Sequence, residues 1–145
     1  MKLRPLTSLI LLPCLMAIIT GCEAPSRTEM KSEFVEVATD LNSSGVIAKS
    51  EKPVLVDFFS STSGHCDSVS AIVDELAIKY HDKMKFVRVN GDENPSLTKT
   101  YQVDSFPTLR VFSQKNKSIM PLLGLRDKMQ VEDYIKKALL TIEQQ

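Results

Sequence analysis

Thiol chemistry is the first reaction that the residues of this chain suggest. Its 145 residues contain three cysteines, at positions 14, 22 and 66, and two histidines. Cys66 directly follows His65 and lies three residues after Ser63. A cysteine reacts as its thiolate, and a neighbouring imidazole that titrates near neutral pH can stabilise that form. Residues 63–66 are therefore the first candidate for a reactive site.

Ser63 has two interpretations. Serine is well suited to cap a helix, and a helix is expected to begin at Gly64. A serine can also be a hydrolytic nucleophile, but no Gly-x-Ser-x-Gly turn and no base with its orienting partner are evident, so capping is favoured. The cysteines and histidines lack the spacing of a metal site, and we expect neither a metal nor a cofactor.

The N-terminus has the layout of an export signal. Lys2 and Arg4 precede an almost unbroken apolar stretch at residues 6–19, which is too short to span a bilayer comfortably. It ends in Ile-Thr-Gly-Cys at residues 19–22, which resembles the lipobox of bacterial lipoproteins. The alternative is an ordinary secretory signal followed by an incidental cysteine. We predict a signal peptide over residues 1–21 and lipidation at Cys22.

This N-terminus also predicts a location and a thiol count. Residues 22–32 are polar after the cysteine and would tether the lipid to one domain at residues 33–145. The protein would be anchored in the bacterial cell envelope and face the periplasm, through either the inner or the outer membrane. Cys14 would leave with the signal and Cys22 would carry lipid. Cys66 would then be the only free thiol, so no internal disulfide could form.

The charge of the chain argues against a nucleic-acid partner. Its 18 basic and 18 acidic residues balance, and no run of Lys or Arg marks a basic face. The membrane, through the lipid, and polypeptides of the envelope are the partners that we expect.

Hydrophobic patterns predict an α/β domain around one mixed sheet. The continuous apolar run at residues 53–59 is typical of a strand buried on both faces, and apolar residues at steps of three and four indicate a helix over residues 64–80. Further strands are expected at 33–37, 84–89, 108–112 and 119–122, the last two forming a hairpin across residues 115–116. Further helices are expected from Thr39 or Asp40, as the cap, to 49, and at 95–101 and 130–140. The order predicts helices on both faces of the sheet.

Five segments of this pattern resemble the thioredoxin family, in the right order and at the right separations over residues 34–139. They are residues 54–58, 74–77, 89–95 and 106–108, and Gly124. The resemblance implies the thioredoxin-like fold. It also implies that residues 62–66, Thr-Ser-Gly-His-Cys, stand where the family has Trp-Cys-Gly-Pro-Cys. Counting from both flanking segments puts Ser63 at the first cysteine and Cys66 at the second.

This replacement would stop the two-thiol cycle of the family. There the first cysteine, at a helix N-terminus, attacks a disulfide as a thiolate, and the second resolves the mixed disulfide. A serine hydroxyl is not ionised at neutral pH and does not exchange with disulfides. Cys66 is then either a slow monothiol or a small buried apolar residue retained from a dithiol ancestor. Ala71 replaces the helix-kinking proline of many relatives.

The resemblance assigns roles to further residues. Asp57 would be buried under the site, with a raised pKa, where relatives use it as a proton acceptor for the second thiol. Arg88 would pair with it, either functionally or as a structural remnant. His65 stands where relatives tune the redox poise, or is simply exposed loop polarity. His81 is expected to be solvated surface.

A peptide-binding groove is the other implied feature. Pro107 would follow a cis bond and expose the backbone of the preceding residue to an extended peptide. Phe106 and Pro107 would form one wall of the groove and Gly124 another. A purely structural turn is the alternative.

Three functions follow from these residues. The first is an envelope-tethered protein, associated with thiol–disulfide homeostasis or polypeptide binding, that takes extended or thiol-bearing polypeptides without dithiol turnover. The second is a monothiol oxidoreductase or isomerase-like enzyme that uses Cys66 with an external thiol. The third is a non-catalytic scaffold subunit of an envelope complex.

Overall fold

The computed structural model describes residues 32–144, apart from residues 115–116, 120 and 125. The predicted signal peptide, the lipidation site at Cys22, the tether up to residue 31 and the hairpin turn at 115–116 lie outside the described residues. Within the described part of the chain, no helix combines the length and the apolar character that crossing a membrane requires.

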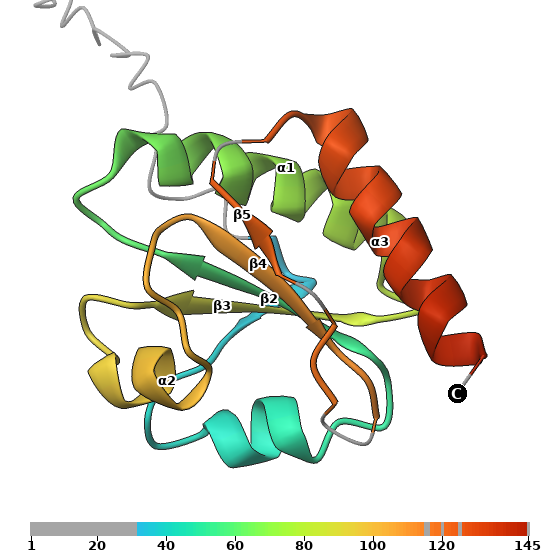
Figure 1. Cartoon of the computed structure of the whole chain (residues 1–145), viewed down its shortest axis with the longest axis horizontal. Helices are drawn as coiled ribbons and strands as arrows, with labels where there is room; N and C mark the ends of the chain where they lie inside the picture. Colours follow the sequence, from blue (N-terminus) through green and yellow to red (C-terminus); the bar gives the residue numbers. More distant parts are fainter. Residues whose placement is uncertain (1–31, 115–116, 120, 125, 145) are drawn as a thin grey trace, which may run out of the picture.

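A five-stranded mixed sheet forms the centre of the domain (Figure 1). Its strands are β1 (Val35–Val37), β2 (Val54–Phe59), β3 (Lys85–Asn90), β4 (Thr108–Phe112) and β5 (Leu122–Leu123), in the spatial order β1-β3-β2-β4-β5. The strands β1, β3 and β2 are parallel, and β4 and β5 are antiparallel to their neighbours. The predicted α/β fold with a mixed sheet is thus confirmed.

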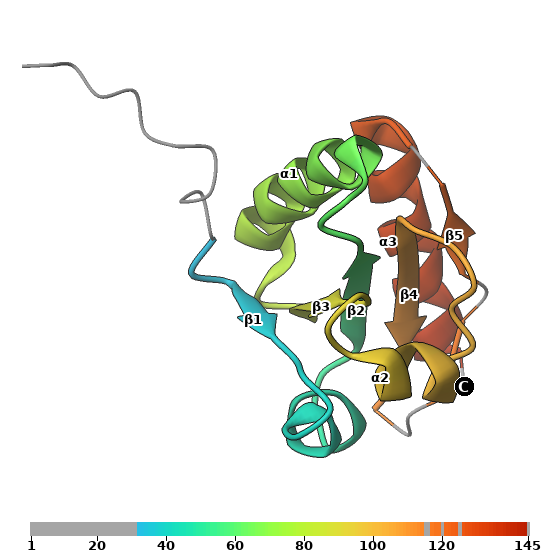
Figure 2. The ribbon, with the colours of Figure 1, turned by 90° about the vertical axis from the view of Figure 1, so that its left-hand side faces the viewer.

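Helices cover both faces of this sheet and create two hydrophobic cores. Helices α1 (Gly64–Tyr80) and α3 (Lys128–Glu143) pack on one face, over buried sheet residues such as Leu55 and Phe86. Helix α2 (Pro95–Thr100) and the π-helical turn η1 (Ser44–Ala48) lie on the opposite side (Figure 2), over Val56 and Val87. Because β2 is central and covered twice, its first five residues are all buried, as the apolar run predicted.

Four predicted elements differ from the structure by two residues or more at an end, and the first of them, the strand predicted at 33–37, begins only at Val35. The segment from Thr39 to 49 contains only the short turn η1, and neither predicted residue caps it, because the Asp40 carboxylate instead accepts the backbone N–H of Leu97 in α2 at 3.0 Å. The last strand is two residues long rather than four, since Pro121 has no N–H for the ladder. Helix α3 begins two residues earlier than predicted, behind the capping box of Asp127 and Gln130.

Candidate functional site

The segment predicted to react, residues 63–66, lies at the end of the loop between β2 and α1 and in the first turn of α1. Ser63 is the N-cap of α1, as its type suggested, but its side chain makes no capping hydrogen bond to the described residues, so the predicted capping contact is wrong. Its carbonyl oxygen accepts the backbone N–H of Cys66 at 3.0 Å. His65 follows on the exposed side of the first turn. The first position of the motif, Ser63, therefore carries a hydroxyl group and lies near the surface.

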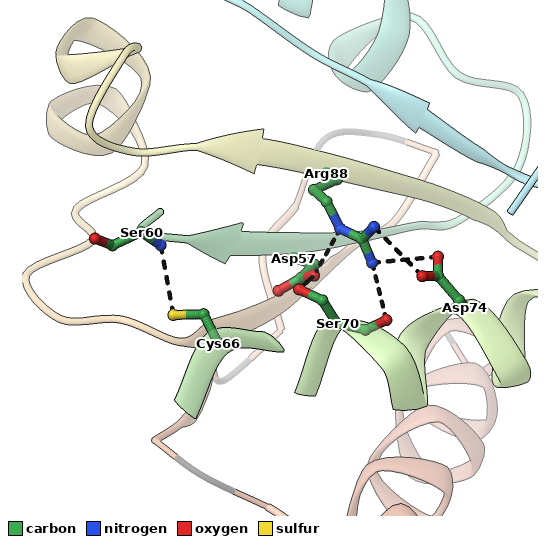
Figure 3. A network of polar contacts seen from close by, with 6 residues as sticks. All are labelled: Asp57, Ser60, Cys66, Ser70, Asp74 and Arg88. Carbon is green, nitrogen blue, oxygen red and sulfur yellow. Dashed lines mark hydrogen bonds and ion pairs between the residues drawn. The ribbon is translucent and has the colours of Figure 1, made fainter. Parts of the chain in front are cut away.

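Cys66 faces inward from the same helical turn and is fully buried. Its Sγ accepts the backbone N–H of Ser60 at 3.4 Å (Figure 3). The described residues include no group of three His, Cys, Asp or Glu side chains that could hold a metal ion. The thiol is sheltered both by burial and by the loop that precedes the helix.

Asp57 and Arg88 form the buried ion pair that the resemblance implied. The two residues lie side by side in register on the parallel strands β2 and β3, and Arg88 Nε donates to Asp57 Oδ2 at 3.1 Å. Asp57 is fully buried, and Ser70 Oγ donates to the same oxygen at 2.7 Å. Loss of hydration raises the pKa of Asp57 despite the lowering effect of the Arg88 charge.

The network around this pair extends along α1. The Arg88 guanidinium also donates to the Ser70 carbonyl oxygen at 2.9 Å and to Asp74 Oδ1 at 3.2 Å (Figure 3). Cys66, Ser70 and Asp74 follow each other at steps of four residues, so they lie on one helix face. The sequence interpretation missed Ser70 and Asp74, although this spacing after Cys66 would have indicated both.

A second polar network ties down the loop that covers Cys66. Oδ2 of Asp92, just after β3, accepts hydrogen bonds at 2.9 Å from Ser60 Oγ, from Ser61 Oγ and from the Ser61 backbone N–H. These bonds lower the pKa of Asp92. The sequence interpretation missed these residues too. Because β2 and β3 are parallel neighbours, the residues that follow them had to meet at one edge of the sheet.

The residues of the predicted peptide groove lie together where β4 begins and β5 ends. The Phe106–Pro107 bond is cis, and the Gly124 N–H donates to the Pro107 carbonyl oxygen at 2.9 Å. Gly124 has φ +75°, a conformation that favours glycine. The Phe106 ring, however, packs inward, where a Cβ on Gly91 would overlap it. The ring of Phe106 therefore packs against the core and does not form the wall of a groove as predicted.

His81 is partly solvated, with 37% of its side chain exposed, but it also makes contacts that the sequence did not indicate. Its ring stacks on that of Phe34, with 4.3 Å between centroids and 7° between planes, and its Nδ1 lies 3.2 Å from Asp82 Oδ1. A hollow of about 530 Å³ opens beside this pair, lined also by Lys49, Met84 and Lys85. It lies at the far end of α1 from Cys66 and contains none of the predicted groove residues.

Comparisons with known proteins agree with this arrangement. The family model described as Thioredoxin matches residues 34–137. A chloroplastic thioredoxin M-type of Chlamydomonas reinhardtii is 33% identical over 116 residues, covering 80% of this chain and 82% of the relative. A thioredoxin of Rickettsia typhi is 34% identical over 109 residues, covering 73% of this chain and all of the relative. Thioredoxin 1 of Synechococcus elongatus is 45% identical over 74 residues, covering 51% of this chain and 69% of the relative.

Proposed function

The chain belongs to the thioredoxin family and is a thioredoxin-like redox protein, and from that premise we propose that it binds extended or thiol-bearing polypeptides without running a two-thiol cycle. The observation that supports this proposal is that the first and last positions of the motif differ in chemistry and in burial. The half-buried first position is Ser63, which cannot attack a disulfide, whereas the thiol of Cys66 is fully buried beneath it. No second thiol accompanies Cys66 in the described domain.

The proposed binding edge lies just before β4, whose first residue, Thr108, pairs with Phe58 near the end of β2. In the described part of the chain, no hydrogen bond engages the backbone N–H or C=O of Phe106. An extended peptide could pair with these groups as an added strand, which gives affinity without a specific side-chain sequence. Next to them, Leu123 pairs in register with Thr108 and is 48% exposed, so it offers an apolar contact to a side chain of the peptide.

Binding should therefore not need the motif. We expect insulin B chain with its cysteines carboxyamidomethylated, a probe without thiol or disulfide, to bind the wild type and the Ser63→Ala/Cys66→Ala variant with the same Kd in fluorescence anisotropy. Leu123→Lys should weaken binding about tenfold, as expected for one apolar interface contact. Leu140→Lys is the matched control, because Leu140 is a similarly exposed leucine on α3. Equal Kd values for the two Leu→Lys variants would refute the groove.

One observation favours the monothiol enzyme as a second candidate. The Ser60 N–H donates to Cys66 Sγ, and the sulfur lies in the first turn of α1, so a donor already faces the atom that would react. Rapid alkylation of Cys66 in the folded wild type, persisting well below the free-thiol pKa of about 8.5, would support this candidate. Slow alkylation supports the binding function, because burial blocks approach to the sulfur.

We further propose that the domain is tethered to the bacterial envelope through lipid on Cys22. The support is the export-signal layout and the Ile-Thr-Gly-Cys sequence at residues 19–22. Cys22→Ala should leave the precursor uncleaved or mislocalised, which gel mobility and membrane fractionation would show. Cys14→Ala, which removes the other cysteine of the N-terminus, should change neither. Normal cleavage and membrane association of the Cys22→Ala protein would contradict the proposal.

A further inference from the structure

One carboxylate, that of Asp92, accepts several hydrogen bonds from the loop over Cys66. Three donors of this loop converge on Oδ2 of Asp92: the Ser60 hydroxyl, the Ser61 hydroxyl and the Ser61 backbone N–H, each at 2.9 Å. Asp92 itself is exposed and belongs to the turn after β3. Residues 60–63 are thus bound to the neighbouring strand end from outside the hydrophobic core.

Ser60 connects this carboxylate directly to the thiol. Its hydroxyl donates to Asp92, and its backbone N–H donates to Cys66 Sγ at 3.4 Å. Ser60 is only 6% exposed, and its carbonyl oxygen accepts the Ser63 N–H at 3.2 Å. Because one residue makes all of these contacts, a shift of its hydroxyl away from Asp92 would also move the amide that covers the sulfur.

We propose that Asp92 is a positioning residue that latches residues 60–63 over Cys66 and keeps the thiol from reacting. This inference rests on the proposed function, since it explains how a member with one thiol avoids trapping its clients covalently. When the latch opens, the Cys66 thiolate can attack a client disulfide. A bond then forms between Sγ and one client sulfur, and the other client sulfur leaves as a thiolate. Ser63 has no thiol to resolve this mixed disulfide, so it persists until an external thiol attacks it.

The charges and the placement of the latch suit a reversible contact. The hydroxyl donors lower the pKa of Asp92, so the carboxylate is ionised at neutral pH and accepts charge-assisted hydrogen bonds. Because Asp92 is exposed, water or a bound partner can compete for these bonds while the two hydrophobic cores stay intact. Local opening of such a loop needs much less free energy than global unfolding.

The test is the rate at which iodoacetamide modifies Cys66 in the folded full-length chain, with the modified cysteine identified by peptide mass spectrometry. We expect Asp92→Ala to raise this rate about tenfold or more above that of the wild type, since the loop loses all three charge-assisted bonds. Asp92→Asn, which keeps one carbonyl acceptor, should give an intermediate rate. Asp104→Ala, at another exposed aspartate that has no hydrogen bond or ion pair within the described domain, should react like the wild type.

The urea dependence of labelling separates latch opening from lost stability. Opening of residues 60–63 exposes little surface, so the raised rate of Asp92→Ala should depend weakly on urea below the unfolding transition. A steep dependence would mean that the variant reacts through global unfolding, and it would overturn the latch. A slow rate in Asp92→Ala, equal to that of the wild type, would also overturn the latch but leave the proposed function intact. A wild type that reacts as fast as the unfolded chain would instead contradict the proposed function.

Discussion

The Ser63→Cys variant should reduce insulin disulfides in the presence of dithiothreitol, whereas the wild type should remain near the uncatalysed rate. The substitution places a thiol at the N-cap of α1, where free N–H groups and the helix dipole stabilise a thiolate. Cys66, three residues later, can then resolve the mixed disulfide. Because loss of a nucleophile can lower kcat by about 10⁶, we expect even partial restoration to raise the rate on the order of 100-fold or more.

The same variant should form an internal disulfide. Residues three apart at the start of a helix lie within the Cα separation that a disulfide needs, and the Cys66 N–H already bonds to the Ser63 carbonyl oxygen. Non-reducing mass spectrometry should show the loss of two protons after mild oxidation. Ser68→Cys is the matched control, because it adds an exposed thiol two residues after Cys66, where the side chains do not face each other. Turnover by the wild type at the rate of Ser63→Cys would contradict the proposed function.

The parts of the fold that depend on long hydrophobic patterns could be predicted from the sequence. Helix α1 and strand β4 have the predicted bounds, and β2 and β3 shift by one residue. Each of these elements buries a periodic or continuous set of apolar residues in a core. Their burial determines whether the segment forms a helix or a strand. The position of Cys66 in the motif could be predicted because the family resemblance fixes the separations from both flanking segments.

Short elements could not be predicted in the same way, because contacts with distant residues decide them. The Asp40 carboxylate accepts a hydrogen bond from α2, more than fifty residues away in the sequence, instead of capping its own segment. The β5 strand is limited by Pro121 and by pairing with β4. For such segments the local sequence permits several structures, and tertiary packing selects one.

Among the polar contacts of the candidate site, too, some could be predicted from the sequence and others could not. Asp57 and Arg88 could be inferred as a pair from the family resemblance, and the parallel strands in register bring them together. The bonds of Ser60 and Ser61 to Asp92 depend on loop geometry that no periodicity encodes. Ser63 shows the converse, since its N-cap position was predictable but its lack of a capping bond was not.

Replacement of the buried acid should change how stability depends on pH. Burial raises the pKa of Asp57 above the value of 3.8 that the unfolded chain would show. As pH rises past 3.8, the unfolded state releases this proton while the folded state retains it, so the wild type loses stability until the folded Asp57 also ionises. Asp57→Asn has no such proton. Relative to the wild type, the free energy of unfolding of Asp57→Asn should therefore increase by about 1.4 kcal/mol for each pH unit across this window.

Urea unfolding of both proteins at each pH from 4 to 9 measures this difference directly. Arg88→Met should extend the window to higher pH, because the guanidinium is the main group that lowers the pKa of Asp57. Asp104→Asn, at an exposed aspartate, should follow the wild type at every pH. A difference between Asp57→Asn and the wild type that stays constant with pH would mean that burial does not raise this pKa. The Asp57 carboxylate would then be ionised throughout this pH range, and it would be too weak a base for the proton-acceptor role that the resemblance implies.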